Sequence, residues 1–172
     1  MLNVTLFDVN KKLCEEWEKV FSPYKNVNIQ NIKLDKLDIH DILVTAGNSY
    51  GIMTGGIDYC VNKRCKFKAQ SLVQQAIDNY WGKLPIGKFV TVDIEKITKG
   101  QFKVLVYAPT METPQIVPAE NVFKVFYPII RTYRDTNLTL ACPGLCSLTG
   151  GVSEKEVAEQ MKKAYDKGMG KE

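Results

Sequence analysis

The chain has 172 residues, of which 45% are hydrophobic and 24% are charged. These values fit one domain over residues 1–172 whose hydrophobic core is stable without disulfide bonds or a structural metal ion, and they exclude global disorder. The formal net charge of +4 is too small, and Lys and Arg are too scattered, to predict a nucleic-acid-binding protein, although a mildly basic surface favours a small anionic ligand.

Strand and helix patterns alternate through the first part of the chain. Residues 2–8 alternate between apolar and polar positions, as a half-buried strand does, and Asn10 can cap a helix that follows. Residues 26–32 alternate in the same way. Residues 42–46 form a continuous apolar run, which is typical of a central strand that is buried on both faces.

A long helical region and a hairpin occupy the middle of the chain. A glycine-rich turn leads into helical spacing over residues 56–81, with room for a break near 66–68. Residues 89–94 and 102–108 flank a Lys-Gly turn, and this arrangement predicts a β-hairpin. A further helix is predicted over residues 118–134, with a proline near its first turn.

The last two elements complete an α/β pattern. Residues 138–142 form a short apolar strand, and Ser153 with Glu156 forms a capping box that opens the final helix. Strands interleaved with helices predict a sheet that is covered on both faces, which is a three-layer α/β/α fold. Because the hairpin adds an antiparallel strand, we expect a mixed, mostly parallel central sheet.

Neither targeting nor metal binding is indicated. The first residues are typical of a strand rather than a signal peptide, and no apolar run approaches the roughly 18 residues of a membrane span. Five cysteines without a secretion signal favour reduced thiols in the cytoplasm, or in the host cytoplasm for a viral protein. Their spacings do not fit a zinc site, and His40 is the only histidine, so we expect no metal and small buried thiols.

Two glycine-rich segments, residues 46–58 and 142–153, each follow an apolar strand directly. Ligands of open α/β sheets bind outside the carboxyl ends of the strands, where glycines let backbone N–H groups approach a phosphate and a helix terminus adds positive potential. Either segment alone is also typical of a tight strand-to-helix turn, but two of them in one domain favour a clamp for a diphosphate. Neither contains the spacing of a P-loop or a dinucleotide fingerprint.

The order and spacing of these segments resemble the macro domain family. In that family a buried strand runs into an Asn-Ala-Ala-Asn-type segment, a glycine-rich loop and a helix, and residues 44–49 and 53–58 are similar to these parts. The family's later loop, Pro-x-x-x-Thr-Gly-x-x-Gly in general form, resembles residues 143–151. Residues 84–87 and 107–111 look like a phage and bacterial branch of the family, and the resemblance covers nearly the whole chain.

The resemblance implies a binding site for ADP-ribose or a close relative, without a cofactor. Asn48 is similar to the family's loop asparagine and would contact the distal ribose, while Asp35, or else Asp38, would accept a hydrogen bond from the adenine amino group. The other ligand-binding positions that the resemblance implies are Ala46, Gly47, Thr54, Gly55, Gly56, Ile57, Pro109, Ser147, Leu148, Thr149, Gly150, Gly151 and Val152.

Hydrolysis of an ADP-ribosyl compound is the activity that the resemblance implies, either as an ADP-ribose 1″-phosphate phosphatase or as a mono-ADP-ribosyl hydrolase. The candidate catalytic residues are Asn48 and Asp58. Hydrolysis requires a positioned water and a base, and Asp58 is the nearest carboxylate, although a carboxylate in the first turn of a helix is favourable without any catalytic role.

Several departures from the family pattern favour an alternative, a non-catalytic module that senses or sequesters the nucleotide. Thr45 stands in place of the first asparagine of the family segment, and Thr54 stands where related sequences often carry an acidic residue. Cys146 and Leu148 replace small glycines in the second segment, and a positive φ at Leu148 would be strained. The shape of the second segment is therefore expected to differ from the family's.

Overall fold

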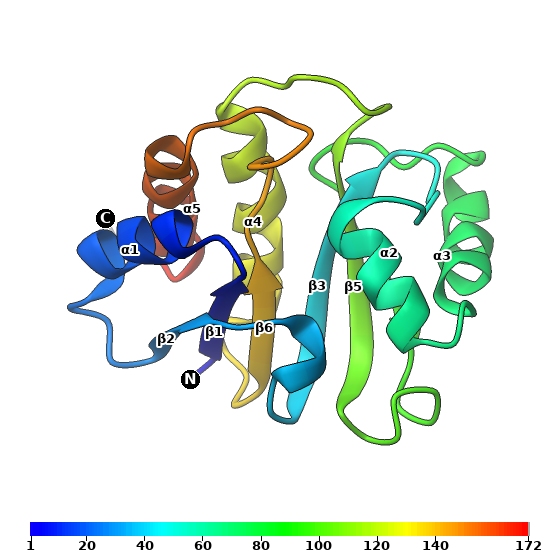
Figure 1. Cartoon of the computed structure of the whole chain (residues 1–172), viewed down its shortest axis with the longest axis horizontal. Coiled ribbons are helices and arrows are strands. Elements are labelled where there is room, and N and C mark those ends of the chain that lie inside the picture. Colours follow the sequence, from blue (N-terminus) through cyan, green and yellow to red (C-terminus); the bar gives the residue numbers. More distant parts are fainter. Residues whose placement is uncertain (172) are drawn as a thin grey trace.

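In the computed structural model, which describes residues 1–171, six strands form one sheet in the order β2-β1-β6-β3-β5-β4 (Figure 1). Strand β4 is antiparallel to β5, and all other neighbouring strands are parallel. The predicted mixed, mostly parallel sheet of an α/β fold is thus confirmed. The strands are β1 (Asn3–Asp8), β2 (Val27–Asn31), β3 (His40–Asn48), β4 (Val90–Asp93), β5 (Phe102–Met111) and β6 (Thr139–Pro143).

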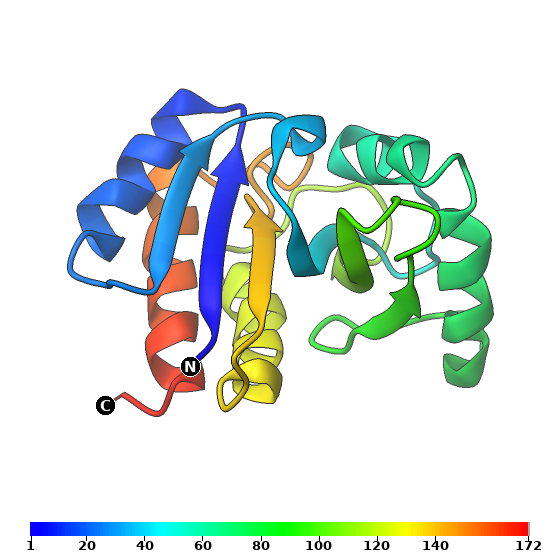
Figure 2. The same cartoon turned by 90° about the horizontal axis from the view of Figure 1, so that it is seen from below.

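Helices cover both faces of this sheet (Figures 1 and 2). One hydrophobic core contains apolar side chains of α1, α4 and α5, and a second core contains those of α2, α3 and the short turn η1. The sheet therefore separates two cores, as a three-layer fold requires. The helices are α1 (Lys11–Phe21), α2 (Gly56–Arg64), α3 (Ala69–Ile77), α4 (Glu120–Tyr133) and α5 (Glu154–Gly168), and the 3₁₀ turns are η1 (Leu34–Lys36) and η2 (Asp78–Tyr80).

Most predicted elements are present, with different ends. The helical region predicted over 56–81 divides into α2 and α3, because Lys66 and Phe67 between them adopt positive φ values of 54° and 58°. Strands β3 and β5 both run several residues beyond the predicted apolar segments. They pair in parallel from His40 to Asn48, so backbone hydrogen bonding extends the strands past the apolar pattern.

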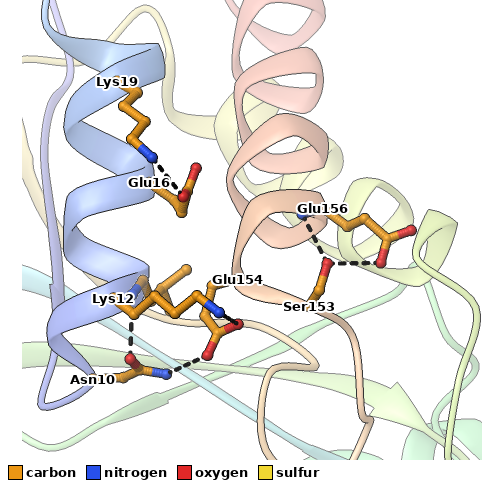
Figure 3. Close-up of polar contacts among 8 residues, drawn as sticks. Asn10, Lys12, Glu16, Lys19, Ser153, Glu154 and Glu156 are labelled. Carbon is orange, nitrogen blue, oxygen red and sulfur yellow. Dashed lines mark hydrogen bonds and ion pairs between the residues drawn. The ribbon is translucent and has the colours of Figure 1, made fainter.

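Helices α1 and α5 begin side by side, and each carries its own side-chain cap (Figure 3). Asn10 Oδ1 accepts a hydrogen bond from Leu13 N (3.2 Å), as predicted. Ser153 Oγ accepts one from Glu156 N (3.3 Å) and donates to the Glu156 carboxylate (2.9 Å), which confirms the capping box. Asn10 Nδ2 also donates to Glu154 Oε1 (3.3 Å), so the two helix starts are joined to each other.

Three further observations concern the cysteines, groups that could bind a metal, and the lengths of the helices. Four of the five cysteines are buried and all five are free thiols, but Cys60 is exposed on α2, so the expectation of buried thiols is wrong for Cys60. Residues 1–171 contain no group of three or more His, Cys, Asp or Glu side chains arranged to hold a metal ion. No helix in this part of the chain combines the length and apolar character needed to cross a membrane.

Candidate functional site

The two predicted glycine segments meet at one edge of the sheet. Because β1, β6, β3 and β5 are parallel, their carboxyl ends share this edge, which lies at the top of Figure 1. Residues 49–55, here the first glycine loop, join β3 to α2, and residues 144–152, the second glycine loop, join β6 to α5. A Cβ built on Gly56 would lie 3.9 Å from Leu148 Cδ2, so the second loop lies close to the start of α2.

Asn48 holds the first glycine loop in shape. Its side-chain oxygen accepts hydrogen bonds from the N–H groups of Tyr50 (3.0 Å) and Ile52 (3.3 Å), and its Nδ2 donates to Ile52 O (2.8 Å). Met53 N donates to Gln70 Oε1 (2.8 Å), which fixes the next part of the loop to α3. Asn48 is half-buried at the end of β3, so its amide both organises the loop and lies at the predicted site.

The amino terminus of α2 has no side-chain cap, in contrast to α1 and α5. Its N-cap residue is Gly55, which has no side chain to accept a hydrogen bond. The N–H groups of Gly56, Ile57 and Asp58 have no acceptor among residues 1–171. Free donors at a helix amino terminus, together with the helix dipole, attract anions. The first turn of α2 therefore has the chemistry of a phosphate-binding site.

The second glycine loop carries a further set of free donors. Its ends are closed by Val152 N, which donates to Cys146 O (3.0 Å), and by Gly151 N, which donates to Leu148 O (3.2 Å). Backbone N–H groups of residues 147–150 have no acceptor in the described part of the chain. Consecutive unpaired N–H groups form the kind of concave backbone surface that binds anions.

The strained residue of this loop is Cys146, not Leu148. Cys146 has a φ of 62°, and Leu148 has no positive φ. A Cβ on Gly150 would lie 2.7 Å from Cys146 O, so Gly150 is required where the loop folds over Cys146. Burial raises the pKa of the Cys146 thiol to about 12, against a smaller opposing effect of a hydrogen bond with Thr110. This neutral, buried thiol packs beneath the loop.

Two contacts that brace the second glycine loop were missed by the sequence analysis. Asp8, the last residue of β1, accepts hydrogen bonds from Gly144 N (3.1 Å) and from Asn10 N (2.9 Å). Val117, in the connection from β5 to α4, donates its N–H to Gly150 O (3.0 Å). The available signal for Asp8 was its position at the carboxyl end of a predicted strand; nothing local marks Val117.

A buried polar cluster lies beneath the first glycine loop. Thr45 Oγ1 donates to Asp58 Oδ1 (2.6 Å), and a Cβ on Gly47 would collide with both Asp58 Oδ2 and Tyr107 Oη. Tyr107 Oη donates to Asn48 O (2.7 Å). Burial raises the pKa of Asp58 to about 7, against the opposing effect of the Thr45 hydrogen bond. Burial, and secondarily the nearby Asp58, raise the pKa of Tyr107 above its ordinary value.

The predicted ligand-binding and catalytic residues differ in their access to a ligand. Within or next to the two loops, Thr54, Gly55, Gly56, Leu148, Thr149 and Gly151 are exposed; Ala46, Asn48, Ile57 and Ser147 are half-buried; and Gly47, Asp58, Pro109, Gly150 and Val152 are buried. The buried members shape the loops from below. The structure thus brings together every predicted position on these segments, with only the exposed and half-buried ones at the surface.

Asp35 and Asp38 are not part of this arrangement. Both are exposed, and they belong to the segment around η1 at the opposite edge of the sheet. There Gln101 Nε2 donates to Leu34 O (3.4 Å) and to Leu37 O (2.9 Å), next to the start of β3. The apolar side chains of Leu34 and Leu37 belong to the second core and hold the segment there. This placement counts against the predicted adenine contact of either aspartate.

Sequence comparison alone adds little. No family model matches the chain. The chain is 25% identical over 123 residues to a protein of Aquifex aeolicus that is described as uncharacterized, and the match covers 70% of each chain.

Solved structures with a similar fold are macrodomains. The macrodomain of Mycobacterium tuberculosis DarG matches with a TM-score of 0.67 at 22% identity, over 80% of this chain and 88% of that one. The macrodomain of Thermus aquaticus DarG matches with a TM-score of 0.64 at 17% identity, over 96% and 91% of the two chains. Thermosipho africanus DarTG in complex with ADP-ribose matches with a TM-score of 0.62 at 15% identity, over 95% and 50%. The chain therefore has the macrodomain fold, as the resemblance predicted; the phage and bacterial branch stays a prediction.

Proposed function

We propose that this protein binds ADP-ribose or a close relative at the carboxyl edge of its sheet, between the two glycine loops. The observation that carries the proposal is the pair of free N–H sets, one in the first turn of α2 and one over residues 147–150, on segments that lie close to each other at Gly56 and Leu148. Each set suits one phosphate, so together they suit a diphosphate. The ADP-ribose complex of Thermosipho africanus DarTG, which has a similar fold, supports this choice of ligand.

The parts of the nucleotide beyond the diphosphate can be assigned by chemistry. The Asn48 amide carries two N–H donors, one of which is used by Ile52 O, so the other is available to a ribose hydroxyl. Asn31 ends β2 at the same edge and donates to Asp8 O (2.8 Å). Because Asn31 lies next to the residue that braces the second glycine loop, we infer that it replaces Asp35 as the candidate for the adenine end.

The geometry favours binding over hydrolysis. The side-chain oxygen of Asn48 is occupied by two backbone N–H groups. Asp58 is 5% exposed, and one of its carboxyl oxygens accepts a hydrogen bond from Thr45, so little of the carboxyl is open to a water at the loop surface. A general base has to lie within hydrogen-bond reach of the proton it removes. The alternative reading, a module that senses or sequesters its ligand, is therefore the better supported of the two activities.

Calorimetric titration with ADP-ribose tests the proposal, with AMP and NAD as comparison ligands. We expect a micromolar dissociation constant, or about −8 kcal/mol, and much weaker binding of AMP. Asn48→Ala should weaken binding, while Asn28→Ala, the same change at an exposed position on β2, should not. Absence of binding at millimolar ADP-ribose would overturn the proposal.

Chromatography of the ligand after the titration separates the two activities. An intact ligand, together with no multiple turnover of ADP-ribose 1″-phosphate or of a mono-ADP-ribosylated protein or nucleobase, would agree with a binding module. Multiple turnover of any of these substrates would make the protein a hydrolase, and loss of turnover in Asn48→Ala would then place Asn48 in its mechanism.

A further inference from the structure

Asp58 carries a buried carboxyl group with no other buried acidic or strongly basic side chain near it in the described part of the chain. Among residues 1–171, no other Asp, Glu, Lys or Arg is buried. Its carboxyl is enclosed by β3 and β5, where it accepts the hydrogen bond from Thr45 and lies against Gly47 and Tyr107. A carboxyl group is seldom buried without a charged partner, because the cost of desolvating its ionised form is large. Its presence directly beneath the proposed binding loop needs an explanation other than packing.

No cation compensates a charge on Asp58. The groups that face it are the Thr45 hydroxyl from β3 and the Tyr107 phenol from β5, and no ion pair of the described residues includes it. Asp58 is also the third residue of α2. The main source of positive potential near its carboxyl is thus the amino terminus of the same helix. A bound phosphate would use that same potential.

We propose that Asp58 sets the affinity of the carboxyl edge for a phosphate group through the amino terminus of α2: the protonated carboxyl permits binding, and the carboxylate opposes it. Asp58 is then a positioning residue that acts through the helix terminus and does not touch the ligand. The inference rests on the proposed function, because the bound group is a phosphate of ADP-ribose.

Titration of Asp58 falls near neutral pH. Burial raises its pKa to about 7, so the fraction of protein with a neutral carboxyl falls as the pH rises through that value. The carboxylate would lie within about one helical turn of the free N–H groups, roughly 5 Å along the axis. One unit charge roughly 5 to 6 Å away, at a dielectric close to that of water (about 50 to 80), changes anion affinity roughly three- to tenfold.

Removing the Thr45 hydroxyl is a second, independent way to change the pKa of the Asp58 carboxyl. Its single hydrogen stabilises the carboxylate, because a hydrogen bond to the charged form lowers a carboxyl pKa. Thr45→Val keeps the shape of the side chain and removes that donor. The pH at which affinity falls should therefore move upward in this variant.

The experiment is calorimetric titration of ADP-ribose between pH 5.5 and 8.5 with the wild type, Asp58→Asn and Thr45→Val. The wild-type affinity should fall roughly three- to tenfold as the pH rises through neutrality. Asp58→Asn should show no such fall and should bind more tightly than the wild type at pH 8.5. Thr45→Val should show the fall at higher pH. His40, at the other edge of the sheet, is unchanged in all three proteins and cannot account for a difference among them.

The possible failures are distinguishable. If none of the three proteins binds ADP-ribose at any pH, the proposed function is wrong. If the wild type binds but its pH profile is flat, or is the same as that of Asp58→Asn, only the role of Asp58 is wrong. NMR of the Asp58 carboxyl carbon in the wild type needs no variant: by reciprocity, saturating ADP-ribose should raise its titration midpoint. A midpoint that does not move would overturn the inference.

Discussion

Replacing Asp58 by Asn should make the stability of the protein less dependent on pH. The folded state keeps the Asp58 proton up to a pKa of about 7, whereas the unfolded chain loses it near the ordinary value of 3.8. Between these values the folded protein holds a proton that the unfolded protein has released. This group therefore lowers the free energy of unfolding as the pH rises from about 4 to about 7, and its effect is constant above that range.

The magnitude follows from the two pKa values. Each pKa unit corresponds to about 1.4 kcal/mol, so ionisation of this one group costs the wild type up to about 4 kcal/mol by pH 8. The amide introduced by Asp58→Asn does not ionise, and its oxygen can still accept the Thr45 hydrogen bond. We expect the variant to gain on the wild type by about 1.4 kcal/mol per pH unit between pH 4 and 7.

Urea denaturation from pH 4.5 to 8.5 measures this difference. Asp38→Asn is the matched control, since Asp38 is exposed and its carboxyl forms no hydrogen bond or ion pair within residues 1–171. The control should follow the wild-type profile. If the wild type and Asp58→Asn gave parallel profiles, the carboxyl would not be buried as described, and the reasoning about its charge would fail with it.

Four further variants test the loops and caps by urea denaturation or hydrogen exchange. Gly47→Ala should lower the free energy of unfolding by about 2 kcal/mol or more, because its Cβ would collide with buried side chains. Gly55→Ala, which has open space at its Cβ, should change the free energy of unfolding by less than about 0.5 kcal/mol. Equal effects of the two substitutions would contradict the close packing around Gly47. Ser153→Ala should cost about 1 kcal/mol through loss of the α5 cap, and no loss would argue against the cap. Asp8→Ala should speed hydrogen exchange in the second glycine loop, and unchanged exchange would show that the loop is held without it.

Features with a local cause could be predicted from the sequence. The caps at Asn10 and Ser153 depend on residues three positions away, and both are confirmed. The glycine loops follow apolar strands directly, so parallel pairing was sufficient to place both at one edge. These predictions needed the order of elements and the general behaviour of open α/β sheets, but no particular tertiary contact.

Features that depend on distant contacts could not be predicted in this way. Asp58 has the sequence pattern of an ordinary carboxylate in the first turn of a helix. Its carboxyl is buried because Gly47 has no side chain to displace it and because Tyr107 packs beside it. The resemblance to the macro domain family implied that Asp35 contacts the ligand, but Leu34 and Leu37 hold that segment at the other edge. In both cases packing between segments decided the position of a polar side chain.

The place of β6 in the sheet has a consequence for how the protein is made. This strand, which leads into the second glycine loop, lies between β1 and β3, and both of those are synthesised much earlier. Until β6 has been synthesised, the edges of β1 and β3 that pair with it in the folded protein have no partner strand. The edge of the sheet that we propose as the ligand site is therefore completed in one late step, when β6 pairs with β1 and β3.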